Sequence, residues 1–298
     1  MIVGLVGCGR WGRNILRDLR ELGCDVHVVA RSPASVERAR EGGARRIVDT
    51  VQDLAGVDGV VVATTTSTHA EVVERSLELD VPVFCEKPLC PDAAHASRLA
   101  ALAPARLFVM DKWRYHPAVL ALGAIAREGS LGAIHGLRTI RIGWGSEHDD
   151  VDAVWVLAPH DLAIALEILG ELLPPRAAVA EAGARGRAGL VGLMSSGERW
   201  HVLEVSSRSP ERVRRVELHC ADGVAFVAGG WDEHVTVLRD TPSGEPSEER
   251  VDTPGELPLL AELRAFVSHL SGGPAPRSSA SEGALVVEHI AALRALAA

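Results

Sequence analysis

The chain has 298 residues, of which 47% are hydrophobic and 24% charged, values typical of a globular protein with room for one or two domains. Its formal net charge of −9 argues against non-specific nucleic-acid binding, and its longest apolar runs are too short to span a membrane. The five cysteines form no CxxC pairs, so we expect neither a disulfide framework nor a zinc site. Because the first strand is expected to begin near residue 1, we expect no signal peptide. These features predict a cytoplasmic protein with most of its cysteines buried.

The first expected strand, residues 2–6, leads directly into a G-x-G-x-x-G motif at residues 7–12. In this pattern Gly7 permits a tight turn, Gly9 lets backbone N–H groups approach a pyrophosphate, and Gly12 lets the next helix pack on the strand. That helix directs its positive end at the anion. The alternative is a glycine turn without a ligand. The position between a strand and an amphipathic helix favours a dinucleotide site, to which we assign Gly7, Gly9, Arg10, Trp11 and Gly12.

The first 110 residues alternate expected strands with expected helices, which is the pattern of a doubly wound parallel sheet. Continuous apolar segments such as residues 60–63 are typical of strands that are buried on both faces. The expected strands are residues 2–6, 26–30, 46–48, 59–64, 81–85 and 107–110, and the expected helices include 34–41, 70–79 and 92–102.

After about residue 130 the pattern changes. Residues 139–142 and 216–220 alternate with a period of two, which indicates an antiparallel sheet with one face solvated or covered by a partner. Residues 241–247 are rich in proline, serine and glycine and predict a surface loop. Further strands are expected near residues 177–181, 189–194, 200–206, 224–228 and 234–239, and closing helices near 256–270 and 282–297.

Four motifs together resemble the Gfo/Idh/MocA oxidoreductases, and the resemblance spans the chain. They are the glycine motif, Thr68-His69, the more specific Glu86-Lys87-Pro88, and Ala158-Pro159-His160-Asp161. The resemblance implies an α/β fold with an N-terminal Rossmann domain (a doubly wound parallel sheet), here residues 1–112. It implies a C-terminal α/β domain with a large, mostly antiparallel sheet, here residues 113–298, that binds substrate and often mediates dimer or tetramer contacts. The implied chemistry is hydride transfer between a nicotinamide and a carbon of a sugar, inositol or sugar nucleotide.

Oxidation of a secondary alcohol requires removal of the hydroxyl proton as the hydride leaves. By the resemblance, Lys87 lies at the carboxyl end of a sheet strand and contacts the reacting oxygen; the alternative is a surface lysine paired with Glu86. We regard Glu86 as a structural partner. The resemblance also places His160 in the active site, reaching from a helix N-terminus as an acid–base group or substrate ligand, although a lone histidine is more often structural. Asp161 is expected to cap that helix or to orient the imidazole.

One residue departs from the family pattern. Relatives commonly carry an aspartate four residues before this histidine, where the present chain has Val156, which cannot titrate or accept a hydrogen bond. Three alternatives remain open. Lys87 and His160 act without the acid, or a nearby acid such as Asp152 substitutes, or the activity is lost or altered.

Tyr115, the single tyrosine, lies where relatives have substrate- or cofactor-facing residues. Its hydroxyl either donates a hydrogen bond near the reacting oxygen, which would make it catalytic, or only caps the core. Arg114 beside it is expected to form a surface pair, with a phosphate or carboxylate ligand as the alternative. The acid-rich segment 147–152 matches no standard set of metal ligands, so we expect a solvated loop there and no metal.

The second expected strand ends in Arg31-Ser32, at the position where NAD enzymes usually place an acid for the ribose hydroxyls. No carboxylate is present, and this pair is suited to a 2′-phosphate, so NADP is favoured and NAD is the alternative. Further cofactor contacts are expected from Thr64, His69, Glu86 and Lys87.

These features predict an NAD(P)-dependent dehydrogenase or ketoreductase that acts on a sugar or a nucleotide-linked sugar. A cyclitol (inositol-type) dehydrogenase is the first alternative. A non-catalytic NADP-binding regulator or subunit is the second, because the usual aspartate is missing. The expected partners are a small-molecule substrate and further copies of the chain, as a homodimer or homotetramer through the C-terminal sheet. No nucleic acid or membrane is expected.

Overall fold

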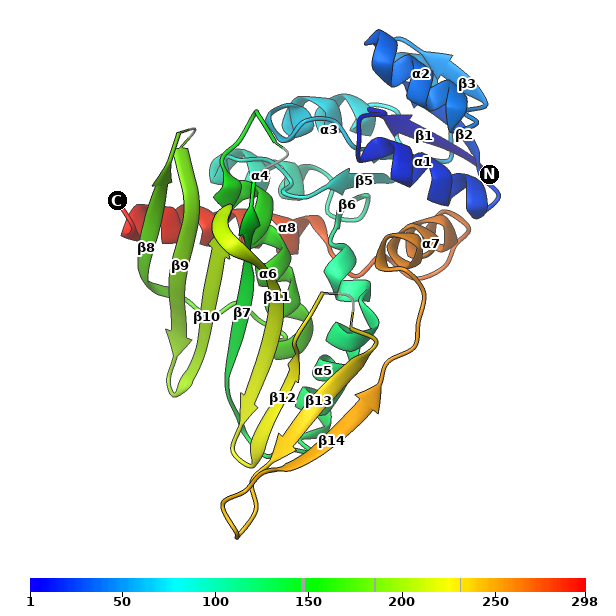
Figure 1. Cartoon of the computed structure of the whole chain (residues 1–298). Helices are drawn as coiled ribbons and strands as arrows, with labels where there is room; N and C mark the ends of the chain where they lie inside the picture. The colour runs from blue at the N-terminus through cyan, green and yellow to red at the C-terminus, as the bar shows by residue number, and fades with distance from the viewer. Residues whose placement is uncertain (146–147, 185, 231) are drawn as a thin grey trace. The chain divides into compact units, whose positions relative to one another are not determined.

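The computed structural model describes residues 1–145, 148–184, 186–230 and 232–298, and the chain divides into two compact units (Figure 1). The first unit comprises residues 1–112 and 257–287, and the second comprises residues 113–256 and 288–298. The division falls within the last helix, α8 (Ala280–Leu296).

The first unit contains a six-stranded sheet in the order β3-β2-β1-β4-β5-β6, and every neighbouring pair is parallel. The strands β4, β5 and β6 are buried along their whole length, as the apolar segments predicted. The order in which the strands are added to the sheet reverses between β1 and β4, which is where doubly wound sheets bind their ligands. The predicted doubly wound sheet is therefore confirmed. Its strands are β1 (Ile2–Val6), β2 (Asp25–Val29), β3 (Arg46–Val48), β4 (Gly59–Val62), β5 (Val83–Glu86) and β6 (Leu107–Met110).

A helix from late in the chain, α7 (Pro258–Leu270), completes the core of the first unit and packs against α1. Phe84 in β5 stacks on Phe266 in α7, with 4.9 Å between ring centroids. A Cβ atom on Gly59 would lie 2.7 Å from Leu270, so glycine is needed where this helix meets β4. The other helices of the unit are α1 (Gly12–Glu21), α2 (Pro33–Glu41), α3 (His69–Leu77), α4 (Ala93–Leu102) and the short η1 (Gln52–Leu54) and η2 (Thr66–Thr68).

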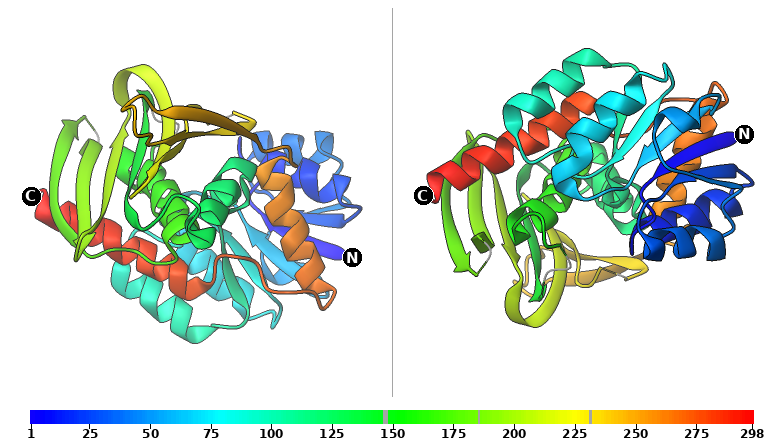
Figure 2. Two further views of the ribbon diagram at one scale, coloured as in Figure 1. Left: turned by 90° about the horizontal axis from the view of Figure 1, so that it is seen from below. Right: turned by 90° about the horizontal axis from the view of Figure 1, so that it is seen from above.

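The second unit contains an eight-stranded sheet in the order β14-β13-β12-β11-β7-β10-β9-β8. All neighbouring pairs are antiparallel except β7 and β10, which confirms the mostly antiparallel sheet. The helices α5 (Pro117–Glu128) and α6 (Ala153–Leu169) lie on one face of this sheet (Figure 2). The strands are β7 (Ile134–Trp144), β8 (Pro175–Gly183), β9 (Gly186–Ser196), β10 (Arg199–Ser206), β11 (Arg208–Cys220), β12 (Gly223–Val227), β13 (His234–Arg239) and β14 (Ser247–Asp252).

Two elements of the second unit, β14 and α5, were not predicted from the sequence. The strand β14 lies at the edge of the sheet and is almost wholly exposed, so it carries no apolar alternation. The expected loop 241–247 leads into it. All five cysteines are buried and free, in agreement with the expectation. Within the described ranges, no helix combines the length and apolar character needed to cross a bilayer.

Candidate cofactor and active site

The glycine motif forms the turn between β1 and α1. Gly7 has a φ of 98°, which favours glycine, and a Cβ atom there would lie 2.7 Å from the carbonyl oxygen of Ala63. A Cβ atom on Gly12 would overlap the carbonyl oxygen of Gly7, so α1 can start here only with glycine. Gly9 differs, because a Cβ atom on it would meet no other atom within 4 Å. The fold itself does not require glycine at position 9, whereas a ligand lying against the loop would.

The first turn of α1 adjoins this open space. No side chain caps the helix, and Arg13 N–H donates to the carbonyl oxygen of Gly9 at 3.2 Å. Backbone N–H groups at a helix N-terminus carry partial positive charge and bind phosphate groups. The open space at Gly9 and the N-terminus of α1 therefore fit the pyrophosphate of a dinucleotide.

The end of β2 is basic. Arg31 Nε donates to the carbonyl oxygen of Asp49 at 3.1 Å, which leaves the other guanidinium N–H groups for a ligand. Ser32 caps α2, and its hydroxyl oxygen accepts a backbone N–H at 3.2 Å. A further arginine that the sequence did not predict, Arg38 in α2, donates from Nε to the carbonyl oxygen of Cys8 at 3.0 Å. This contact ties α2 to the glycine motif.

His69 connects the segments that follow β4 and β5. Its buried ring places Nδ1 at 2.8 Å from the carbonyl oxygen of Pro88 and Nε2 at 3.2 Å from that of Thr64. Burial lowers the pKa of His69, and a neutral ring has one N–H to donate. The shorter contact assigns that hydrogen to Nδ1. His69 thus fixes the segment that carries Lys87.

Glu86, at the end of β5, joins this segment to the glycine motif. One carboxylate oxygen accepts the indole N–H of Trp11, next to the start of α1. The other accepts the backbone N–H of Lys87 at 3.1 Å. The ammonium group of Lys112 lies 4.3 Å from the Trp11 ring centroid, in a cation–π contact. Glu86 is therefore held from two sides. The Lys87–Pro88 peptide bond is cis.

Two buried carboxyl groups interact with this cluster and were not predicted. Glu262 in α7 is 1% exposed, and Asp111 after β6 is 3% exposed. Burial raises the pKa of Glu262 well above its usual value, and the negative charges of Glu86 and Asp111 add to this effect. The positive charges of Lys112 and Lys87 act in the opposite direction and lower the pKa. Buried acids with raised pKa values are frequent at functional sites.

In the second unit, His160 lies inside α6 and not at its N-terminus. The helix begins at Ala153 and contains Pro159, so the predicted helix start near His160 is wrong. Pro159 suggested a boundary because proline lacks the N–H of a helix interior. Asp152 instead caps the helix, accepting a backbone N–H of the first turn at 3.5 Å. The His160 ring meets the Trp113 ring edge-on, with 6.4 Å between centroids.

Asp161 does not cap α6, contrary to one of the two expected roles. It pairs with Arg141 in β7, with Nε to Oδ2 at 2.7 Å and Nη2 to Oδ1 at 3.4 Å, and both side chains are buried. Burial raises the pKa of Asp161, while the positive charges of Arg141 and Arg214 oppose this. Because breaking a buried pair costs about 3–5 kcal/mol, this contact holds α6, and with it His160, firmly on the sheet.

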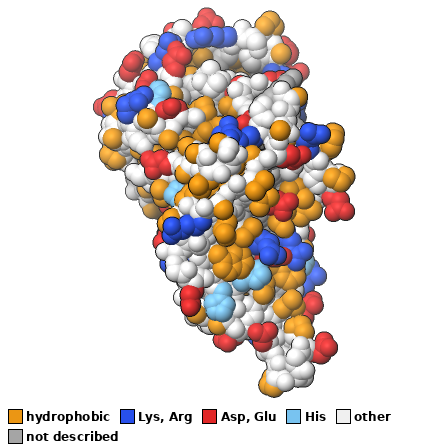
Figure 3. All heavy atoms as spheres, turned by 90° about the vertical axis from the view of Figure 1, so that its left-hand side faces the viewer, with side chains coloured by type: hydrophobic (Ala, Val, Ile, Leu, Met, Phe, Trp, Pro, Cys, Tyr) orange, Lys and Arg blue, Asp and Glu red, His pale blue; other side chains and the backbone are white. Residues whose placement is uncertain are grey.

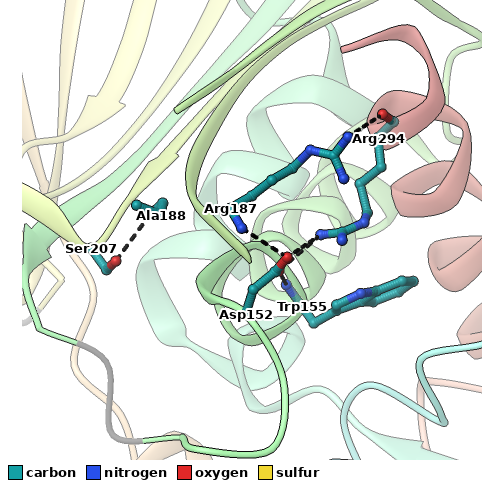
Figure 4. A network of polar contacts seen from close by, with 6 residues as sticks. All are labelled: Asp152, Trp155, Arg187, Ala188, Ser207 and Arg294. Carbon is teal, nitrogen blue, oxygen red and sulfur yellow. Dashed lines mark hydrogen bonds and ion pairs between the residues drawn. The ribbon is translucent and has the colours of Figure 1, made fainter. Parts of the chain in front are cut away.

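Asp152 belongs to a structural network at the start of α6 (Figure 4). Arg294 Nη1 lies 2.8 and 2.7 Å from its two carboxylate oxygens, and the backbone N–H of Arg187 donates to it at 3.1 Å. Arg187 Nη2 in turn donates to the carbonyl oxygen of Arg294 at 2.9 Å. With both oxygens engaged, Asp152 is poorly suited to replace the acid that is missing at Val156, one helical turn before His160.

Tyr115 ends the short helix η3 (Lys112–Tyr115) and is partly buried. In the same segment Trp113 stacks on His116, with 5.0 Å between ring centroids. Arg114 was expected to pair at the surface, but it is buried and pairs with the buried Glu167, Nε to Oε2, at 3.3 Å. A buried partner therefore replaces the expected surface partner.

The predicted site residues fall into both units. The cofactor-binding residues and Lys87 lie in the first unit, while Tyr115 and His160 lie in the second. Residue 147 of the acid-rich segment lies outside the described residues. Within the described ranges, no three His, Cys, Asp or Glu side chains are grouped so as to hold a metal ion.

Residues 1–108 match the family model described as oxidoreductase family, NAD-binding Rossmann fold. Inositol 2-dehydrogenase 1 of Paenarthrobacter aurescens is 34% identical over 143 residues, which cover 44% of this chain and 42% of that protein. D-apiose dehydrogenase of Paraburkholderia graminis is 33% identical over 138 residues, or 43% of this chain and 36% of that protein. The chain thus aligns with less than half the length of these relatives.

Solved structures resemble the whole chain. UDP-N-acetylglucosamine 3-dehydrogenase from Acidithiobacillus ferrooxidans superposes with a TM-score of 0.86 at 24% identity, over 99% of this chain and 97% of that chain. A levoglucosan dehydrogenase in complex with NADH and levoglucosan superposes with a TM-score of 0.88 at 16% identity, over 100% and 97%. At these identities the likeness establishes a shared fold.

Proposed function

We propose that the chain is a member of the Gfo/Idh/MocA oxidoreductase family, whose model residues 1–108 match, and that it is an NAD(P)-dependent dehydrogenase or ketoreductase. The proposed substrate is a sugar or nucleotide-linked sugar that reacts at a hydroxyl or keto carbon. The observation that carries the proposal is the open space beside Gly9 at the start of α1, which a dinucleotide pyrophosphate fits. The similarity to inositol and apiose dehydrogenases supports the substrate class.

The nicotinamide supplies the hydride acceptor or donor when it is bound. In this proposal Lys87, directly after β5, hydrogen-bonds the reacting oxygen and moves its proton. Glu86 and His69 hold the Lys87 segment in place through the contacts described above. Glu262 and Asp111 add buried carboxyl groups that interact electrostatically with this part of the site.

His160 and Tyr115 complete the proposed catalytic set from the second unit. Val156 cannot accept a proton, so proton transfer rests on Lys87, and His160 orients the substrate hydroxyl or relays the proton. The fixed position of α6, through the pair of Asp161 with Arg141, gives His160 the rigid support that orientation requires. The Tyr115 hydroxyl is proposed to donate near the reacting oxygen.

Hydride transfer tests the proposal directly. The absorbance of reduced nicotinamide is followed with NADP and with NAD against free sugars, UDP-linked sugars and myo-inositol. We expect turnover of a sugar or nucleotide-linked sugar. Turnover of myo-inositol alone would establish the cyclitol alternative, which the similarity to inositol dehydrogenases favours. NADPH binding without any turnover would establish the non-catalytic alternative, which Val156 favours.

We propose NADP as the preferred cofactor because Arg31 and Ser32 stand where an acid would hold the ribose of NAD. Arg31→Ala is expected to weaken NADPH binding by roughly 1–3 kcal/mol, the scale of a hydrogen bond to a charged group, and to spare NADH. Fluorescence titration of both cofactors measures this. Arg40→Ala is a matched control, since Arg40 is an exposed α2 arginine that pairs with Glu37. An equal loss for NADPH and NADH in Arg31→Ala would contradict the assignment.

The face of the second sheet opposite α6 supports a homodimer or homotetramer. Val179 in β8 is 73% exposed and lies opposite Val191 in β9, which is 47% exposed. Leu193 in β9 and Trp144 in β7 are also exposed. Hydrophobic side chains gather on this side of the second unit among histidine and charged side chains (Figure 3). Because monomers rarely expose large contiguous apolar patches, we propose that a second copy covers this face.

Light scattering is expected to show a dimer or tetramer at micromolar concentration. Val191→Asp is expected to shift the protein toward the monomer, because it places a charge in the covered face. Leu102→Asp, at an exposed leucine of the first unit, is the control and should leave the mass unchanged. A wild-type protein with only the 31.6 kDa monomer mass would contradict the proposal.

A cytoplasmic location is proposed from the cysteines. All five are free and buried, which suits a reducing compartment.

A further inference from the structure

Three arginines gather on the helix-covered face of the second unit's sheet. Arg141 in β7 and Arg214 in β11 lie directly opposite each other in the antiparallel pair, so their side chains share one face. Arg141 is buried there against α6, where it pairs with Asp161. Arg212 precedes Arg214 by two residues on the same strand, and a Cβ atom on Gly143 would lie 3.7 Å from its Cγ. This set of Arg141, Arg212 and Arg214 is called the arginine cluster below.

In the described part of the chain, one of the three arginines of the cluster forms an ion pair with a carboxylate, that of Arg141 with Asp161. The charge of Asp161 also acts on Arg214, without an ion pair. Arg214 Nη1 donates to two backbone carbonyl oxygens, at 2.5 and 2.7 Å, and in the described part of the chain neither Arg214 nor Arg212 pairs with a carboxylate. Burial and the charges of Arg141 and Arg212 together lower the pKa of Arg214 to about 10, while the charge of Asp161 acts in the opposite direction. Like charges opposite each other in a sheet are destabilising, so this arrangement is suited to an anion that is not part of the chain.

The arginine cluster and His160 both contact Trp113. The Arg141 guanidinium lies 4.4 Å from the Trp113 ring centroid, and the His160 ring meets the edge of that same ring. A Cβ atom on Gly230 would lie 3.0 Å from Arg214 Cβ and 3.2 Å from Trp113, so glycine lets this backbone lie against both side chains. Trp113 therefore links the arginine cluster to His160 within the second unit.

We propose that Arg214, with Arg141 and Arg212, binds a negatively charged group of the substrate. The inference rests on the proposed dehydrogenase function and narrows its substrate to sugars that carry a carboxylate or a phosphate. Planar guanidinium groups donate in pairs to both of these anions, which is why arginine suits them. A neutral cyclitol would bring no charge to oppose that of the cluster. The arginine cluster therefore favours a charged sugar over a neutral cyclitol as the substrate.

Binding to the cofactor-saturated protein tests the inference without requiring turnover. Isothermal titration is carried out with glucuronate, glucose 6-phosphate and myo-inositol, so that the first two probes distinguish a carboxylate from a phosphate. Arg214→Gln removes the charge at the centre of the cluster. Arg212→Gln removes an exposed charge that forms no ion pair with any of the residues that the structure describes. Arg215→Gln is the matched control, because the next residue of β11 points to the opposite face and pairs with Glu217.

A charged sugar is expected to bind the wild-type protein more tightly than myo-inositol. Arg214→Gln should weaken that binding about tenfold to a hundredfold, the scale of a hydrogen bond to a charged group, while Arg215→Gln should leave it unchanged. Equal binding of charged and neutral sugars, or wild-type affinity in both Arg214→Gln and Arg212→Gln, would overturn the anion site. Tight, Arg214-dependent binding without any hydride transfer would uphold the anion site and contradict the proposed dehydrogenase activity.

Discussion

Replacing Lys87 by methionine is expected to lower kcat by roughly 10²–10⁴-fold on the true substrate, the usual range for one acid–base group. Methionine keeps an unbranched stem and removes the ammonium donor, while the backbone N–H of residue 87 can still donate to Glu86. The affinity for the cofactor should change little, because the pyrophosphate and ribose contacts are assigned elsewhere. Steady-state turnover and cofactor titration on the same preparation measure both quantities.

His160→Asn separates the two roles proposed for the histidine. If His160 only orients the substrate, His160→Asn should lower kcat less than Lys87→Met does. If His160 moves the proton, the two variants should lower kcat by about the same factor. The pair of Asp161 with Arg141 does not involve the imidazole, so α6 should keep its place on the sheet. Near-wild-type turnover by Lys87→Met would remove Lys87 from the mechanism.

Replacing Gly9 by valine is expected to abolish cofactor binding without loss of folding. A Cβ atom at this position meets nothing within 4 Å, so the substitution causes no clash at Cβ and places a side chain beside the space assigned to the pyrophosphate. The melting temperature should stay near that of the wild type, and fluorescence titration should detect no binding of NADPH or NADH. Wild-type cofactor affinity in this variant would show that the pyrophosphate lies elsewhere.

Gly12→Ala provides the contrasting control, because its Cβ atom would overlap the carbonyl oxygen of Gly7. The backbone must shift to relieve this overlap, so we expect a loss of stability of about 1–3 kcal/mol, the usual cost of overpacking. The two variants thus separate a glycine required by the fold from a glycine required by a ligand. A stability loss in Gly9→Val as large as that in Gly12→Ala would undermine this distinction.

The first unit was predictable because its signals are local. The β4 residues are apolar throughout, as a strand buried on both faces requires, and the glycine motif follows β1 directly. Expected and observed strands differ by one or two residues at their ends. The doubly wound sheet then places the ends of β1, β2, β4 and β5 along one edge, which is why the assigned cofactor residues could be grouped from the sequence.

The parts that the sequence did not predict depend on contacts between distant segments. Glu262 lies in a helix that follows the second sheet, and only the packing of α7 on the first unit brings it near Glu86 and Asp111. The start of α6 was placed too late because Pro159 resembles a helix boundary, whereas Asp152 supplies the cap.

The arginine cluster was not predicted for a related reason. Arg141 and Arg214 become neighbours only through the register of β7 and β11. The register cannot be predicted from either strand alone, because each strand by itself shows only that an arginine lies on its inward face.

An isotopic label on the substrate shows whether a hydride passes to the nicotinamide. The protein is incubated with NADP and the sugar of the panel that it oxidises, carrying deuterium on the reacting carbon, and the recovered NADPH is examined by mass spectrometry. We expect NADPH that carries the deuterium, formed at a rate that falls in Lys87→Met. NADPH without deuterium, or no reduction of either cofactor by any member of the panel, would contradict the proposed hydride transfer.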